Sequence, residues 1–197
     1  MNMKFAEIAS RIAKLEEELK QEFERDIKEK QLQFQYSIEK GKIAFEQEVS
    51  MLHKRIRMGV MTFLWKSSWA SLLVAPMIYS LFVPLILLDL WIWLYQAICF
   101  PVYGVSKVER KRYVVLDRGN LGYLNFIERF NCNYCGYANG LMAYSREIAS
   151  RTEQYFCPIK HAHRMSGTHP RYNNFLEFGD SKDYLKELER FRESLRS

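Results

Sequence analysis

The sequence predicts an all-α membrane protein, with a long N-terminal coiled-coil-like helix, a helical hairpin and a small, mainly helical C-terminal metal-binding domain. Three observations predict this fold class. Residues 1–58 mix apolar and charged side chains, with 12 basic and 11 acidic residues. Residues 67–104 carry a single charge, Asp89. The remaining residues are again polar and contain a Cys-x-x-Cys pair. Charges segregated this strongly are not typical of one mixed soluble core.

Residues 1–60 are predicted to form a helical arm. The arm has no proline, and apolar residues recur every three or four positions, as along one face of a helix. Acid–base pairs four residues apart, such as Glu16 and Lys20, stabilise such a helix. Because nothing within the arm covers the apolar stripe, we expect a coiled coil or bundle that makes the chain a homo-oligomer. A helix on a membrane surface is the alternative, which the even mixture of Glu and Lys disfavours.

Residues 61–106 are predicted to form a transmembrane or re-entrant helical hairpin. Lys66 and Lys107 bracket forty residues with one charge, and a single helix of that length would be about twice as long as the roughly 30 Å hydrocarbon core. We therefore expect two passes, at 64–83 and 90–105, joined by a turn at 84–89. Basic residues flank both ends, which predicts an integral membrane protein with both termini in the cytoplasm.

Asp89 is the one charged residue of this segment. A carboxylate inside a membrane is a candidate for proton or ion handling. The alternative is a carboxylate at the turn of the hairpin, where it lies at the wet interface.

Residues 107–175 are predicted to form a small cytoplasmic Cys/His domain. Cys132 and Cys135 are two residues apart, which allows both thiolates to bind one tetrahedral ion. Cys157 precedes Pro158, a favoured first residue of a helix, and the N-terminus of a helix stabilises a thiolate. His161 follows four residues later on the same face of that helix. The predicted metal ligands are therefore Cys132, Cys135, Cys157 and His161, with His163 as a substitute for His161.

The run Cys132-Asn-Tyr-Cys135-Gly136-Tyr137 resembles the knuckle of rubredoxins and zinc ribbons over six residues. The resemblance implies zinc, with iron as the alternative, although Lys160 stands where rubredoxins have a further cysteine. If residues 137–156 formed one straight helix, its ends would be nearly 30 Å apart, too far for one ion within one chain. A loop near Gly136 would allow a single-chain site, and a site shared between protomers is the other arrangement. A redox-active dithiol or buried structural cysteines remain open as well.

The predicted helix between the two ligand clusters carries Glu147, Arg151 and Glu153 on its polar side. These residues form either a patch facing a partner or substrate, or an ordinary solvated face. Residues 176–197 are predicted to form an amphipathic tail helix with no chemistry of its own.

No set of catalytic residues is recognisable, so catalysis stays open. The predicted function is a membrane-anchored scaffold or assembly protein, with a zinc-stapled domain on the cytoplasmic face, an oligomerising arm, and the lipid bilayer and an unidentified protein as partners. One alternative is a membrane redox or electron-transfer protein that uses iron or a dithiol at the same cysteines. Another is an anionic-lipid or nucleic-acid binder, suggested by the 11 basic against 5 acidic residues of 105–175 and by the many tyrosines there. Nucleic acid is disfavoured, because basic residues beside a membrane already account for this charge.

Overall fold

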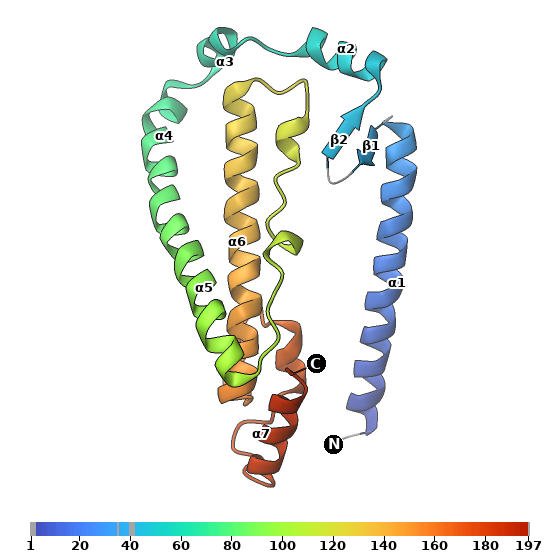
Figure 1. The fold of residues 1–197 in the computed structure, drawn as a ribbon, viewed down its shortest axis with the longest axis vertical. Helices are drawn as coiled ribbons and strands as arrows, with labels where there is room; N and C mark the ends of the chain where they lie inside the picture. The colour runs from blue at the N-terminus through green and yellow to red at the C-terminus, as the bar shows by residue number, and fades with distance from the viewer. Residues whose placement is uncertain (1–2, 35, 40–41, 197) are drawn as a thin grey trace. The chain divides into compact units, whose positions relative to one another are not determined.

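The computed structural model describes residues 3–34, 36–39 and 42–196. It is mainly helical, with 70% of the chain in helices and almost no strand (Figure 1), as expected for the all-α class. The chain divides into two compact units. One comprises Met1–Gly59 and Asn120–Asn125, and the other comprises Val60–Gly119 and Phe126–Ser197. Each unit is described by itself.

The first unit contains two helices and a β-hairpin. Their bounds are α1 Met3–Gln33, β1 Tyr36–Glu39, β2 Lys42–Phe45 and α2 Gln47–Ile56. The strands are antiparallel, with Tyr36 opposite Phe45 and Ile38 opposite Ile43. The prediction of one continuous helix over residues 1–60 is therefore wrong. Aromatic and β-branched residues alternate with polar ones at these positions, and such cross-strand pairs favour a hairpin over a helix.

The second unit contains the other helices of the described chain. The α-helices are α3 Val60–Lys66, α4 Trp69–Ser80, α5 Phe82–Tyr103, α6 Phe126–Phe156 and α7 Tyr184–Glu193. The short 3-10 helices are η1 Arg110–Arg112, η2 Arg118–Asn120 and η3 Pro170–Asn174. In Figure 1, α6 runs beside α4 and α5, and the chain after α5 returns along α6.

The apolar segment forms one nearly continuous helical layer, α4 followed by α5, where a hairpin was predicted. Pro84 and Asp89 both lie within α5, so the predicted turn at 84–89 is wrong. The only break is at Leu81, and it has a local cause: Pro84 lacks the N–H that would bond to the carbonyl of Ser80. The layer ends at Gly104, which adopts the left-handed conformation (φ 67°) typical of a helix C-terminus.

The core of the second unit lies between α5 and α6. Its buried members come from α5, from the chain that follows it, from α6 and from the C-terminus: Leu85, Phe100, Val105, Val108, Tyr134, Leu141, Tyr144, Ile148 and Leu195. A smaller cluster joins α7 to η3 through Tyr172, Phe175 and Phe191. The buried side of the α4–α5 layer therefore faces α6, and its other side faces away from this core.

Candidate functional site

The outer side of α4 and α5 is an apolar surface that the described chain leaves uncovered. Only 6% of the most apolar 18-residue stretch of Trp69–Tyr103 is buried. Eight apolar side chains of α5 are between 47% and 75% exposed. They are Val83, Ile86, Leu87, Leu90, Trp91, Trp93, Ile98 and Val102. Soluble proteins rarely expose so large a contiguous apolar surface, and where they do, it binds a protein or a membrane.

All four tryptophans of the chain lie along this apolar segment. Trp65 and Trp69 flank the start of α4 with exposures of 86% and 83%. Trp91 and Trp93 lie in α5 with exposures of 69% and 56%. Tryptophans that are exposed on an apolar surface are typical of proteins that contact the interfacial region of a bilayer.

The inner side of the layer holds Asp89 in a polar contact. The carboxylate accepts two hydrogen bonds from Arg110, at 3.1 Å from Nε and 2.6 Å from Nη2, and one from the hydroxyl of Tyr137 at 3.0 Å. The pKa of Tyr137 is raised to about 12, mainly by burial and secondly by its hydrogen bond to Asp89. The same carboxylate raises the pKa of Arg110. Asp89 is thus bound by a permanent cation, an arrangement that stabilises the contact of α5 with η1 and α6.

Gly136 and Gly140 bring the chain after α5 close to α6. A Cβ atom at Gly140 would lie 2.5 Å from the carbonyl oxygen of Tyr113 and 2.8 Å from the Cα of Val114. A Cβ at Gly136 would lie 3.3 Å from the carbonyl oxygen of Val115. The two glycines therefore allow residues 113–115, which directly follow η1, to pack against the backbone of α6.

The structure does not bring the predicted metal ligands together within one chain. Cys132 and Cys135 lie inside α6, which continues through Gly136 and Gly140 without the loop that a single-chain site requires. Cys157 follows the last residue of α6, so about 33 Å of helix separates it from Cys135. Within the described residues, no group of three or more His, Cys, Asp and Glu side chains is placed to hold a metal ion. The described residues therefore do not form the single-chain arrangement, which was expected only with a loop near Gly136.

The surroundings of Cys157 also differ from the prediction. Pro158 does not begin a helix; instead, Ile159 forms an isolated parallel bridge with Leu176. Cys157 is exposed, and so are His161 and His163 in the loop that follows. Cys157 therefore lacks the helix N-terminus that was expected to stabilise its thiolate. A zinc or iron ion held in another way, such as between protomers, stays a prediction.

The acidic residues at the end of α6 bind other parts of the same chain. The Oε1 atom of Glu147 accepts hydrogen bonds from Arg171 at 2.6 Å and Arg151 at 2.8 Å. Burial acts to raise the pKa of Glu147, but the bonds from Arg171 and Arg151 outweigh it, so the pKa lies below its usual value. Glu153 contacts His169 at 2.8 Å. These contacts connect α6 to η3. Glu147, Arg151 and Glu153 therefore bind within the chain, which favours a structural role over a surface that binds a partner.

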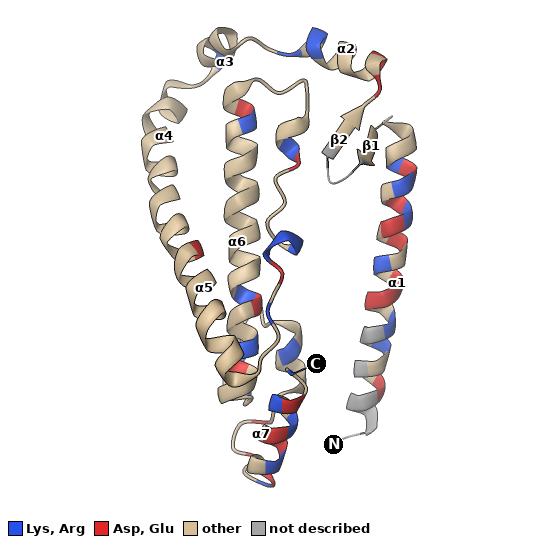
Figure 2. Cartoon of the chain, viewed as in Figure 1, with Lys and Arg blue, Asp and Glu red and all other residues tan. Residues whose placement is uncertain are grey.

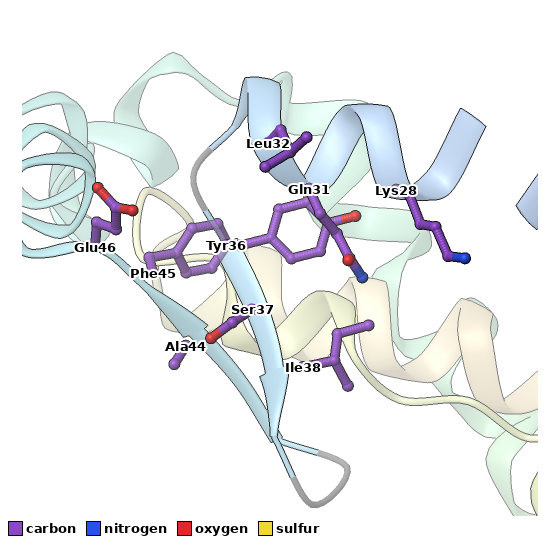
Figure 3. A pocket seen from close by; sticks show the side chains of 9 residues that line it. All are labelled: Lys28, Gln31, Leu32, Tyr36, Ser37, Ile38, Ala44, Phe45 and Glu46. Atoms are coloured by element: carbon purple, nitrogen blue, oxygen red, sulfur yellow. The ribbon is translucent and has the colours of Figure 1, made fainter. Parts of the chain in front are cut away.

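The first unit has an open groove of about 650 Å³ between the end of α1 and the hairpin (Figure 3). Tyr36 and Phe45 form one part of it, with ring centroids 5.9 Å apart. Lys28 and Glu46 lie at opposite ends of the labelled residues in Figure 3. An apolar groove with two opposite charges does not by itself indicate a ligand class.

Comparisons with known proteins add no identity. No family model matches the chain, and neither a curated protein nor a solved structure is significantly similar to it.

Sequence reasoning missed the partners of Asp89 and the role of the two α6 glycines. The spacing Gly136-x-x-x-Gly140 was a usable signal, because glycines four residues apart in a helix lie on one side and permit close backbone approach. No comparable signal indicated Arg110 or Tyr137, whose proximity to Asp89 arises from tertiary packing.

Proposed function

We propose that this chain is a membrane-anchored scaffold protein, whose α4–α5 layer binds a lipid bilayer and whose N-terminal arm binds a second copy of the chain. The observation that carries the proposal is the uncovered apolar side of α4 and α5. Trp69–Tyr103 is long enough and apolar enough to insert into a membrane, and the chain buries little of it.

A bilayer fits this surface better than a soluble partner does. The surface is about 50 Å long at 1.5 Å per residue, and Asp89, its one charged residue, lies on the inner side against Arg110. Protein interfaces of non-obligate complexes are only about as apolar as the rest of a protein surface. Lys66 and Lys107 lie just beyond the two ends, where they can reach lipid headgroups.

The arm supports the scaffold part of the proposal. Its apolar residues Ile8, Ile12, Leu15, Leu19 and Phe23 are 46–70% exposed along α1. Residues 4–14 hold three basic residues and one acidic residue, whereas residues 16–26 hold six acidic and two basic residues. An antiparallel pair of α1 helices places the basic part of one copy against the acidic part of the other, which favours a second copy as the partner.

Flotation with lipid vesicles tests the membrane part. We expect the full chain to float with phosphatidylcholine vesicles and, in high salt, with vesicles that also contain phosphatidylglycerol, because apolar insertion is not screened by salt. Leu87→Glu, on the outer side of α5, should weaken binding by at least about tenfold, since one buried leucine contributes about 1.5–3 kcal/mol.

Leu185→Glu is the matched control, because Leu185 is 75% exposed on α7 of the same unit. It should bind as the unchanged protein does. Equal binding by both variants, or binding that salt abolishes, would contradict insertion of the α4–α5 side.

A further inference from the structure

We infer that the α4–α5 layer lies parallel to the membrane, with its outer side inserted in one leaflet, and does not cross the bilayer. The inference rests on the proposed membrane binding and adds its orientation. Its basis is the position of charged side chains along the axis of the α4–α5 layer, because this position sets how deep they would lie in a bilayer that the layer crossed. Figure 2 shows such residues on the chain beside α6, along the length of the α4–α5 layer.

A perpendicular crossing would use only part of the layer. The 35 residues of Trp69–Tyr103 extend over about 52 Å, whereas the hydrocarbon core is about 30 Å thick and needs about 20 residues. A crossing segment would therefore have to be either the C-terminal part, mostly α5, or the N-terminal part, mostly α4. Each choice carries charged neighbours into the bilayer.

A crossing by α5 would put η1 near the middle of the membrane. Asp89 lies three residues from the centre of α5 and binds Arg110, the first residue of η1. Glu109 and Arg112 form an ion pair at 2.7 Å whose side chains stay 61% and 77% exposed, and Lys111 between them is exposed as well. An exposed charge at the centre of a bilayer costs about 2.5–3.5 kcal/mol even on the lowest scale, so this placement is unfavourable.

A crossing by residues 69–89 meets the same obstacle. Its centre, Tyr79, donates a hydrogen bond to Asn131 at 2.5 Å, and Glu128 and Arg129 lie one turn from Asn131 toward the start of α6. Near the same height, a Cβ at Gly119 would meet Asn133 at 2.8 Å. Asp117 and Arg118, directly before Gly119, are exposed. Exposed charges would again lie deep in the hydrocarbon.

A layer that lies flat avoids both penalties. The outer side chains of α4 and α5 enter one leaflet, as the apolar face of an interfacial helix does, to a depth of about 5–10 Å. The chain of 105–119 and the charged residues of η1 then remain in water, on the other side of α5. Lys66 and Lys107 both reach the same membrane surface, where the tryptophans, 56–86% exposed, are available to the interfacial region.

Two native thiols test the orientation. Cys135 lies in α6 next to Tyr134, whose ring stacks on Phe82 at the start of α5, with 5.6 Å between ring centroids. Cys157 follows the other end of α6, and both cysteines are exposed. A flat layer places both thiols on one side of the membrane, whereas any crossing places Cys135 within the bilayer or on the side opposite Cys157.

The experiment uses the full chain with Cys99→Ala and Cys132→Ala, reconstituted in sealed phosphatidylcholine–phosphatidylglycerol vesicles. An impermeant maleimide is added outside, and the mass of the intact protein is measured. We expect two labels on each labelled chain, and two on every chain after detergent is added. Labelled chains that carry a single label before detergent and two after it would overturn the inference.

If the double variant does not fold, the unchanged protein is added to preformed vesicles and labelled, and peptide mapping identifies which cysteines carry the maleimide. Equal labelling of Cys135 and Cys157 is expected; labelling of Cys157 alone contradicts the flat orientation. Protein that does not float with the vesicles refutes membrane binding itself, an outcome distinct from either labelling pattern.

Discussion

At the residue scale, Glu147 shows how the end of α6 is held in place. Its carboxylate contacts Arg151 and Arg171, and Arg151 in turn donates to the carbonyl and hydroxyl oxygens of Ser106 at 2.5 and 2.8 Å. A carboxylate with two guanidinium partners connects three segments that are distant in sequence. Its removal leaves two cations side by side without their shared anion, which is costlier than the loss of one exposed ion pair.

We therefore expect Glu147→Gln to lower the free energy of unfolding by about 2 kcal/mol at neutral pH. The pKa of Glu147 is lowered from its ordinary value of 4.5 by Arg171 and Arg151 in the folded state. Its contribution is thus present above pH 4.5 and is lost as the pH falls through the folded-state pKa. Thermal unfolding in detergent across this range should show the two proteins converging in acid. A constant difference would contradict the role of the charge.

Gly140 gives a second prediction at this scale. Gly140→Ala should destabilise the protein by about 1–3 kcal/mol, because the new methyl group meets backbone atoms of Tyr113 and Val114 that cannot move alone. Gly136→Ala, with a nearest atom at 3.3 Å, should cost less. Ala143→Val, on an exposed part of α6, is the control for added bulk. Chemical unfolding gives the order, and an unaffected Gly140→Ala protein would contradict the close contact of this segment with α6.

At the element scale, the apolar periodicity of the arm correctly predicted the helix of α1, but the boundary of the helix was missed. A helix and a hairpin both place apolar residues at short intervals, and only local alternation around Ile38 and Ile43 distinguishes them. The predicted turn at 84–89 failed for a different reason. Proline near the start of a helix is tolerated, so Pro84 permitted α5 to continue through Asp89.

The oligomerising role of α1 is tested by a double substitution in the full chain. Leu15→Glu with Leu19→Glu places two charges on the exposed apolar stripe and should convert a dimer to a monomer in detergent, because both side chains lie at its centre. Sedimentation velocity measures the change. Leu185→Glu, which places a charge on α7 and leaves α1 unchanged, serves as the control. A chain that sediments as a monomer before any substitution would contradict the antiparallel pairing.

At the scale of the whole molecule, composition predicted more than spacing did. The forty residues with one charge correctly indicated an apolar helical segment, since charge depletion reflects burial in the protein or in lipid whatever the detailed path of the chain. The Cys/His spacing did not predict how these residues are arranged within one chain. Ligand geometry depends on whether residues 136–140 form a loop or a helix, and the packing of Gly136 and Gly140 against 113–115 decides in favour of the helix.

The same packing explains why the sequence alone did not predict the proposed flat orientation. The positive-inside tendency concerns the ends of an apolar segment, whereas the flat orientation depends on charged residues beside its middle. Arg110 and Arg112 come after the segment in sequence and reach its midpoint only because the chain turns back along α6. Tertiary structure thus changes the meaning of a hydropathy pattern.

Quenching of the native tryptophans by bilayers of brominated lipid is the most direct test of membrane binding through the α4–α5 layer. Three of the four tryptophans, Trp69, Trp91 and Trp93, are exposed on the α4–α5 layer, and Trp65 is exposed in α3 just before it, so most of the emission reports this surface. We predict that bromine on the acyl chains quenches most of the emission, and that binding shields the tryptophans from aqueous acrylamide. Unquenched emission that remains accessible to acrylamide in the presence of vesicles would contradict it.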